Sequence, residues 1–294
     1  MRLWALSAHS KTPAPRASSE IRGPVFKPKK GGSHHALNGR TTIIRDTQTV
    51  RKIVQSDSMR RLALLDWDGT LRRGYTIVPW VKQLVRVGVL SKNCKEGLLQ
   101  FFLDYKKESI SHDDLARLTA GMYAKHLRGQ LKARLKDQAR IFVNSDQNAL
   151  FKWSRELMTR LKSSNISTIV ISGAPIEVLE AFQRPLQLDV VYGLDLEVEN
   201  GVYTGRVRLN PGISTVKKRV VDELARVTKG GSVLIAFGDS SSDMPLFDSA
   251  KVSVMVGDKL LPSQRVSHRI TNRTSSKQIQ EIITHATTPE VHRD

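Results

Sequence analysis

Short, uniformly apolar runs that stop at polar loops recur along this chain. The first covers residues 62–65, Leu-Ala-Leu-Leu, and breaks off into Asp-Trp-Asp-Gly-Thr. Continuous hydrophobicity of this length is typical of a buried parallel strand. Similar runs predict further strands at residues 167–171, 190–193, 232–237 and 252–256. Two alternating runs around Asn200-Gly201 predict a β-hairpin over 194–206, and residues 214–227 have the spacing of an amphipathic helix.

A long helical pattern separates the first strand from the second. It covers residues 72–165, where no strand signal occurs. Apolar residues recur there at spacings of three and four, as at Ile77, Trp80, Val81 and Leu84. The aromatic residues of this stretch are predicted to belong to the hydrophobic core, and His112 and His126 to its surface.

The order of these elements defines the expected architecture. A strand, a helical insertion and then alternating strands and helices predict an α/β fold: a Rossmann-like parallel sheet with helices on both faces, plus an inserted helical cap domain after the first strand. We expect a basic extension at 1–58, a catalytic core made of 59–71 and 166–294, and the cap at 72–165. The polar tail from about residue 284 is expected to fray.

Composition limits the class of protein. The 294 residues are 39% hydrophobic and 26% charged, ordinary values for a globular protein with a substantial core. No apolar run approaches the roughly 20 residues needed to cross a bilayer. The single cysteine, Cys94, excludes an intramolecular disulfide and any metal site built from several cysteines, and it is consistent with a reducing compartment.

Residues 1–58 differ from the rest of the chain. They are rich in Pro, Gly, Ser, Lys and Arg and carry +8 of the net charge of +19, and we predict disorder because they have little to bury. They are interpreted either as an organellar transit peptide or as residues upstream of the true start, since Met59 closely precedes the first strand. The expected location is the cytoplasm, or an organelle if the extension is a transit peptide.

Three of the predicted strands end in groups suited to one kind of chemistry. Strand by strand, these groups are Asp66 and Asp68, then Ser172 and Gly173, then Asp239 and Asp243. Because parallel strands have their carboxyl ends at one edge of a sheet, where ligands bind in such folds, we expect these residues to gather there. Four neighbouring carboxylates need a cation, and oxygen ligands alone favour Mg²⁺ over zinc.

Such a site suits phosphoryl transfer. A carboxylate beside Mg²⁺ can attack phosphorus to form an acyl-phosphate, and a second carboxylate two residues on can protonate the leaving oxygen and then activate water. The Ser172 hydroxyl, the Gly173 amide and a lysine on the following helix would supply the donors and the positive charge that the transferring group requires.

These motifs resemble those of the haloacid dehalogenase-like superfamily of phosphohydrolases. Residues 66–70 are similar to its first motif, Ser172-Gly173 to its second and residues 238–243 to its fourth, so the resemblance covers about 61–257.

The resemblance implies a role for each matching residue. Asp66 would be the nucleophile and Asp68 the general acid/base, while Thr70 would orient Asp66 or bind phosphate. The implied Mg²⁺ ligands are Asp66, the backbone carbonyl of Asp68 and Asp239, with Asp243 close behind. The third motif is a lysine, for which both Lys217 and Lys218 qualify. Lys217 is favoured because Val220, Val221 and Leu224 then follow on the buried side of the helix, which leaves Lys217 near the edge of the sheet.

Finer features resemble the phosphoserine phosphatase-like branch of this superfamily. They are the helical cap, the hairpin at 199–205 and the stretch 102–106, which looks like members acting on phosphoserine or histidinol phosphate. Phosphoserine phosphatases place a glutamate just after the first motif to read the substrate ammonium, and residues 72–75 here contain no acid. This departure weakens the case for phosphoserine itself. Arg72 and Arg73 are interpreted either as selecting a more anionic substrate or, preferably, as solvated.

The sequence therefore predicts a Mg²⁺-dependent phosphatase that hydrolyses a small phosphorylated metabolite through an aspartyl-phosphate. One alternative is a phosphotransferase or phosphomutase of the same fold, since the difference depends on what enters the closed cap. The other is a basic nucleic-acid- or membrane-binding protein that uses residues 1–58, in which case binding should weaken steeply with salt and be lost when 1–58 are deleted.

Overall fold

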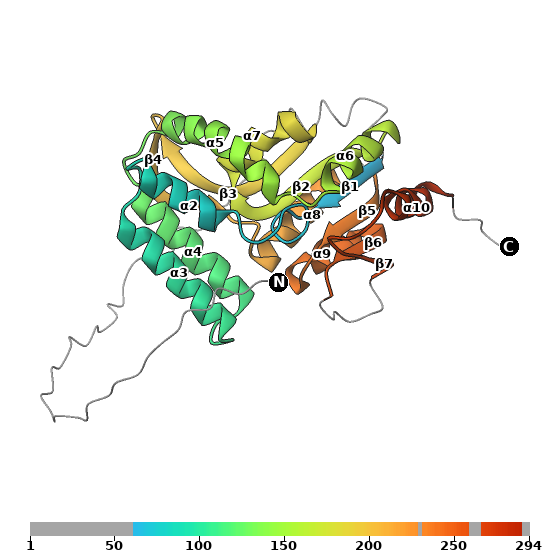
Figure 1. The fold of residues 1–294 in the computed structure, drawn as a ribbon, viewed down its shortest axis with the longest axis horizontal. Helices are drawn as coiled ribbons and strands as arrows, with labels where there is room; N and C mark the ends of the chain where they lie inside the picture. The colour runs from blue at the N-terminus through green and yellow to red at the C-terminus, as the bar shows by residue number, and fades with distance from the viewer. Residues whose placement is uncertain (1–60, 229–230, 259–265, 290–294) are drawn as a thin grey trace, which may run out of the picture. The chain divides into compact units, whose positions relative to one another are not determined.

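The computed structural model describes residues 61–228, 231–258 and 266–289, all of which belong to one compact unit of the chain. Within these ranges a strand, a long helical segment and then alternating strands and helices follow one another (Figure 1). The predictions made for residues 1–58 and for a start at Met59 lie outside the described residues.

Among the described residues, seven strands form one sheet. They are β1 (Arg61–Leu65), β2 (Ser167–Pro175), β3 (Val190–Glu199), β4 (Val202–Leu209), β5 (Ser232–Gly238), β6 (Ala250–Val256) and β7 (His268–Ile270). The strand order is β4-β3-β2-β1-β5-β6-β7, and every neighbouring pair is parallel except β3 and β4. The predicted α/β fold around a mostly parallel sheet is therefore confirmed.

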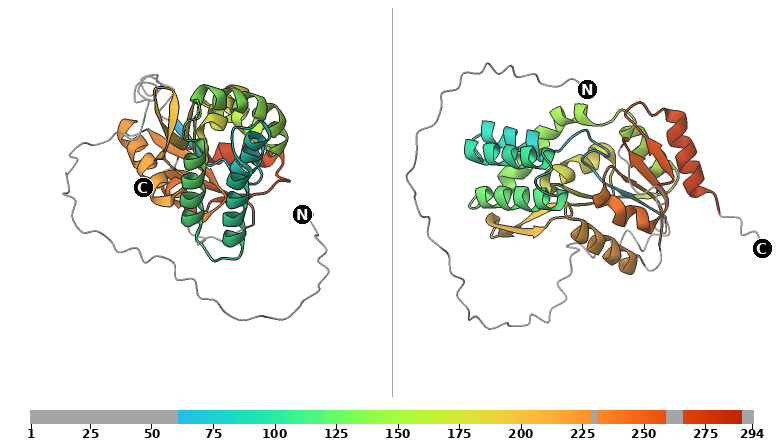
Figure 2. Two further views of the ribbon diagram at one scale, coloured as in Figure 1. Left: turned by 90° about the vertical axis from the view of Figure 1, so that its left-hand side faces the viewer. Right: turned by 90° about the horizontal axis from the view of Figure 1, so that it is seen from below.

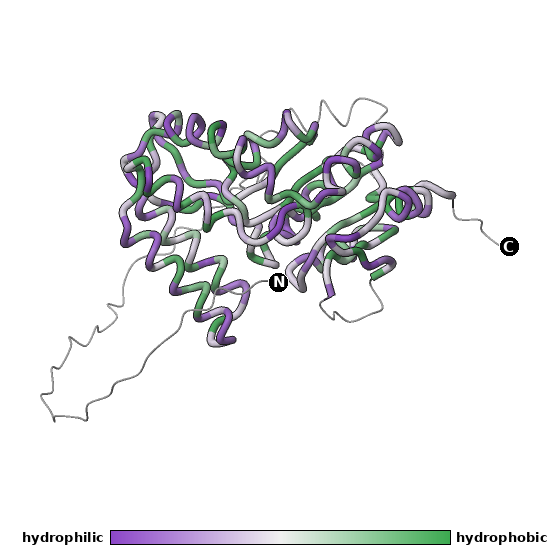
Figure 3. The backbone as a smooth tube through the Cα atoms, viewed as in Figure 1, coloured by the Kyte–Doolittle hydropathy of each residue, from purple (hydrophilic) through white to green (hydrophobic). Residues whose placement is uncertain are grey.

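Helices cover both faces of this sheet. In chain order the α-helices are α2 (Ile77–Arg86), α3 (Lys92–Lys106), α4 (His112–Leu127), α5 (Lys132–Asp146), α6 (Ser154–Ser163), α7 (Ile176–Leu186), α8 (Ser214–Val227), α9 (Met244–Ser249) and α10 (Ser276–Thr287). Ala63 and Leu65 of β1 belong to the hydrophobic layer that includes α6, α7 and α10. Leu62 and Leu64 belong to the opposite layer, with α8 and α9. Because successive residues of a strand point to opposite faces, a strand buried on both faces is apolar throughout, as Figure 3 shows for the central strands.

The segment between β1 and β2 is the predicted helical insertion. Its helices α2, α3 and α4 lie together, away from β5, β6 and β7 (Figures 1 and 2). The β3–β4 hairpin reaches out to the insertion, where the Tyr203 carbonyl accepts a backbone hydrogen bond from Gly129 at 2.9 Å and the Tyr203 amide donates one to Gln130 at 3.0 Å. Asn200 and Gly201 both have positive φ at the hairpin turn, which is why this dipeptide is suited to it. No helix in the described ranges is long and apolar enough to cross a membrane.

Three details differ from the sequence prediction. Strand β3 runs without a break from Val190 to Glu199, so the predicted short strand and the first arm of the hairpin are one element. The short strand β7 was not predicted. Helix α10 continues to Thr287 and buries Ala286, so the expectation of fraying from residue 284 is wrong. The cause is packing, because the apolar face of α10 covers the sheet and this contact keeps the last turn of the helix formed.

Candidate active site

The candidate site lies where the chain order of the sheet reverses. From β1 the chain continues to β2 and β3 on one side, and it later returns to place β5 on the other side of β1. In open α/β sheets, ligands bind at such a switch point, beyond the carboxyl ends of the strands. The amide of Asp66, directly after β1, donates to the Phe237 carbonyl of β5 at 2.9 Å. This pairing brings the loops that follow β1 and β5 together.

Three aspartates converge there and form what we call the acidic cluster: Asp66, Asp239 and Asp243. Each offers a carboxylate oxygen within 4.8 Å of the others. Two glycines make this approach possible, since a Cβ on Gly69 would overlap the Asp239 carboxylate and one on Gly238 would overlap the Asp243 side chain. Of the four strand-end carboxylates predicted to gather, these three do so, and Asp68 is not part of the cluster.

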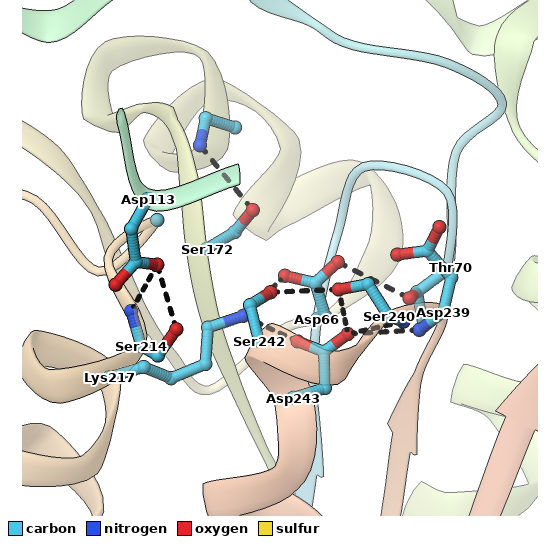
Figure 4. Close-up of polar contacts among 12 residues, drawn as sticks. Asp66, Thr70, Asp113, Ser172, Ser214, Lys217, Asp239, Ser240, Ser242 and Asp243 are labelled. Atoms are coloured by element: carbon cyan, nitrogen blue, oxygen red, sulfur yellow. Dashed lines mark hydrogen bonds and ion pairs between the residues drawn. The ribbon is translucent and has the colours of Figure 1, made fainter. Parts of the chain in front are cut away.

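Asp243 organises the loop after β5 (Figure 4). One of its oxygens accepts hydrogen bonds from the backbone amides of Asp239 and Ser240, each at 3.0 Å. Its other oxygen accepts a hydrogen bond from Lys217 Nζ at 2.6 Å. Both oxygens of Asp243 thus have protein donors, and this residue links the loop after β5 to Lys217.

Of the two candidate lysines, the structure places Lys217 at the site. Its side chain is 2% exposed, and Nζ donates to Asp66 Oδ1 at 2.9 Å as well as to Asp243. Lys218 is 64% exposed on the other side of α8 and pairs with Asp222. The helical period explains the difference, because adjacent residues on a helix point about 100° apart.

The charges of the site are unbalanced without a cation. Burial raises the pKa of Asp66 well above its usual range, and repulsion from Asp243 and Asp239 adds to this effect, although Lys217 opposes it. Burial alone would lower the pKa of Lys217, but Asp243 and Asp66 outweigh burial and raise it. The exclusively oxygen donor set of the acidic cluster, with one ammonium for three carboxylates, fits a hard divalent cation such as Mg²⁺.

The Asp68 carboxylate is bound by Thr76, just before α2. Its Oδ1 accepts hydrogen bonds from the Thr76 amide at 2.9 Å and from the Thr76 hydroxyl. Burial raises the pKa of Asp68 to about 6, and the contact with Thr76 partly offsets the rise. Thr70, in the same loop, has its hydroxyl 3.3 Å from Asp66 Oδ2, where it can orient that carboxylate. Asp68 is therefore held apart from Asp66 in a different environment, and a carboxyl group with a pKa near 6 suits acid/base chemistry.

Ser172 and Gly173, at the carboxyl end of β2, line the same cavity as Asp66, Asp68 and Lys217. The Ser172 hydroxyl accepts a weak hydrogen bond from the Ala174 amide at 3.4 Å, which leaves its own proton available to a ligand. Gly173 lies against Gly212, and a Cβ on Gly173 would contact the Gly212 backbone. Of the residues predicted to bind phosphate, Ser172, Gly173 and Lys217 thus line one cavity, and Thr70 contacts Asp66, which lines it too.

The insertion is joined to the sheet beside this cavity. Asp113, in the first turn of α4, accepts hydrogen bonds from the backbone amide and the hydroxyl of Ser214 at 3.0 and 2.7 Å (Figure 4). The Asn210 side chain donates to the Ala116 carbonyl of α4 at 2.8 Å. These contacts attach α4 to the start of α8, the helix that carries Lys217.

Sequence reasoning missed several residues around the cavity. His112 lines it and is half-buried, with its ring edge-on to Tyr105 at 5.9 Å, so it is only in part the surface residue that was predicted. Tyr75 and Phe102 line it too, although the aromatic residues were predicted to be core. Helical spacing alone does not distinguish a side chain that faces a core from one that faces a cavity beside it.

Arg72 is a second correction, because it is buried where a solvated side chain was preferred. Its Nε and Nη2 each donate to a carboxylate oxygen of Asp146, at 2.7 Å, and both side chains are at most 6% exposed. Arg73 is exposed and donates to backbone carbonyls at the end of the insertion. Neither arginine lines the cavity.

Comparison with known proteins agrees with this geometry. The family model for haloacid dehalogenase-like hydrolase matches residues 63–248, more than half of the chain. The chain belongs to the haloacid dehalogenase-like hydrolase family. Its curated relatives lie in the phosphoserine phosphatase-like branch, which confirms the resemblance seen in its motifs.

Two of these relatives are phosphoserine phosphatases. The one from Archaeoglobus fulgidus is 26% identical over 205 residues, covering 68% of this chain and 53% of its own length. The one from Lactococcus lactis is 28% identical over 128 residues, covering 42% of this chain and 58% of its own length. The chain thus spans little more than half the length of these relatives. A solved structure described as a phospho-aspartyl intermediate analogue of phosphoserine phosphatase matches 75% of this chain and 97% of its own, with 18% identity and a TM-score of 0.54, and so shares the fold.

Proposed function

We propose that this protein is a Mg²⁺-dependent phosphatase that hydrolyses a small phosphomonoester through an aspartyl-phosphate. The main support is that two carboxylates at one cavity are held by different partners. Asp66 is oriented by Lys217 and Thr70, whereas Asp68, two residues on, is held by Thr76. This difference supports a role in attack for Asp66 and a role in proton transfer for Asp68.

Each residue has a task in this scheme. The Asp66 carboxylate attacks phosphorus, and Asp68, protonated, gives its proton to the leaving alcohol. Asp68 then takes a proton from the water that cleaves the aspartyl-phosphate. The Ser172 hydroxyl, the Gly173 amide and Lys217 Nζ bind the phosphoryl oxygens.

The cation would be held by Asp66, the Asp68 carbonyl and Asp239, with Asp243 behind them. When bound, Mg²⁺ neutralises charge on the phosphoryl group. The insertion covers the cavity and limits the entry of water. We further propose that the substrate is a small phosphorylated metabolite and that the reaction takes place in a reducing compartment such as the cytoplasm.

The test is phosphate release from a panel of monoesters with Mg²⁺, including O-phosphoserine, histidinol phosphate, sugar phosphates and 4-nitrophenyl phosphate. Asp66→Asn and treatment with EDTA should each abolish release. Asp222→Asn is the matched control, because Asp222 is an exposed aspartate paired with Lys218 and should not affect the rate. If folded, Mg²⁺-loaded wild type releases phosphate from none of these esters, hydrolysis of small monoesters is wrong. Transfer to another acceptor would then be the reaction to test.

A further inference from the structure

The cavity has two chemically different walls. The wall at the edge of the sheet carries the charged groups described above. The wall opposite is built mainly by the insertion, and its members are mostly apolar or aromatic. They are Tyr75, Ile77, Phe102, Leu115, Ala116, Thr119 and Leu194, together with His112 at the start of α4. Among them, the Tyr75 and Phe102 rings pack against each other with centroids 4.9 Å apart.

Among the described residues, this second wall includes no carboxylate, lysine or arginine, and His112 is its one imidazole. Among the described residues that line the cavity, the carboxylates are Asp66, Asp68 and Asp239, and the only lysine or arginine is Lys217. All four lie at the edge of the sheet. Arg72, the nearest arginine in sequence to the first motif, is committed to Asp146 and does not line the cavity.

An amino-acid substrate would therefore be poorly matched. The ammonium of phosphoserine would lie against the second wall without a carboxylate to pair with, and burying an unpaired charge is strongly unfavourable. An uncharged alkyl or aromatic group would instead exchange water for contact with Ile77, Phe102 and Leu115. The side chains of Ile77 and Leu115 are almost completely buried already, so this surface is preformed.

We infer that the second wall selects phosphomonoesters whose alcohol part is apolar and carries no ammonium. This inference rests on the proposed phosphatase activity and specifies its substrate class.

The decisive measurement is kcat/KM for wild type with ethyl, propyl and butyl phosphate, compared with O-phosphoserine, phosphoethanolamine and phosphocholine. The leaving groups are all aliphatic alcohols, which keeps the chemical step comparable. We expect kcat/KM to rise about fourfold with each added methylene, from the transfer free energy of a buried CH₂ group. We also expect O-phosphoserine to lie more than tenfold below propyl phosphate. A flat series, or a preference for any of the charged esters, would overturn the inference.

Phe102→Ala tests the wall directly, because it should flatten the dependence on chain length. Leu103→Ala is the matched control, since Leu103 follows Phe102 on α3, is 50% exposed and does not line the cavity. Hydrolysis of 4-nitrophenyl phosphate distinguishes a failure of the substrate inference from a failure of the proposed function. If wild type hydrolyses this ester but favours charged alcohols, only the substrate inference fails; if it hydrolyses no ester, the proposed function fails with it.

Discussion

The buried ion pair between Arg72 and Asp146 leads to a quantitative prediction about stability. Replacing Asp146 by alanine leaves the Arg72 guanidinium buried without its carboxylate, and breaking one side of a buried pair costs about 3–5 kcal/mol. Helix α5 also offers a control. Asp137 pairs with Arg140 at 2.9 Å, but these side chains are 65% and 73% exposed, so Asp137→Ala should cost less than about 1 kcal/mol. The two aspartates differ mainly in burial.

The assay is urea denaturation followed by tryptophan fluorescence and circular dichroism. In thermal unfolding of a domain of this size, the same loss of about 3–5 kcal/mol in the free energy of unfolding corresponds to a fall in Tm of roughly 6–20 °C. The double variant with Arg72→Met and Asp146→Leu should recover most of the loss, because apolar side chains need no partner. The reasoning is refuted if Asp146→Ala and Asp137→Ala destabilise the protein equally at unchanged m-value.

Three further predictions concern activity. Lys217→Ala should lower kcat about 100- to 1000-fold by removing a buried charge at the phosphoryl group, whereas Lys218→Ala should leave kcat unchanged in the same assay; equal effects would contradict the assignment of Lys217. Gly69→Ala should abolish Mg²⁺-dependent activity because its Cβ overlaps the acidic cluster. Gly74→Ala, also at positive φ but with open space around it, should retain activity and lose only stability. A Gly69→Ala variant with wild-type Mg²⁺ dependence would show the overlap to be harmless. Asp68→Asn should lower kcat/KM, which reports formation of the aspartyl-phosphate, about 100-fold or more with an alkyl phosphate. With 4-nitrophenyl phosphate, whose leaving group needs no proton, the loss in kcat/KM should be less than about tenfold, and equal losses in kcat/KM with both esters would rule out proton donation by Asp68. The wild-type kcat/KM for the alkyl ester should fall as the pH rises above about 6, where Asp68 loses the proton it donates.

The parts of the site that could be predicted are those attached to regular strands. Asp66 and Asp239 directly follow β1 and β5, so knowing the strands was enough to bring the two residues together. The choice between Lys217 and Lys218 followed from the buried side of an amphipathic helix in the same way. In each case the backbone period converts a position in sequence into a position in space.

The rest depended on contacts that no local pattern carries. Arg72 and Asp146 are 74 residues apart in sequence, and nothing in the spacing of either residue indicates the other. The same holds for the wall of the cavity, because Tyr75, Phe102 and Leu194 come from a loop, a helix and a strand that meet only in the folded chain. Strand β7 is only three residues long, too short to give a periodic signal.

Helix α8 begins without a cap of its own. Ile213, at its N-cap position, has no side-chain hydrogen bond, and the first helical amide, that of Ser214, donates instead to Asp113 of the insertion. An N-cap stabilises a helix by about 1 kcal/mol, so α8 depends on a distant segment for that stabilisation. Any motion that lifts α4 to admit a substrate must break this bond and loosen the first turn of α8, which holds Lys217. Entry of the substrate and the rigidity of Lys217 are thus thermodynamically linked. Hydrogen exchange at the Ser214 amide would report how often the bond to Asp113 is broken.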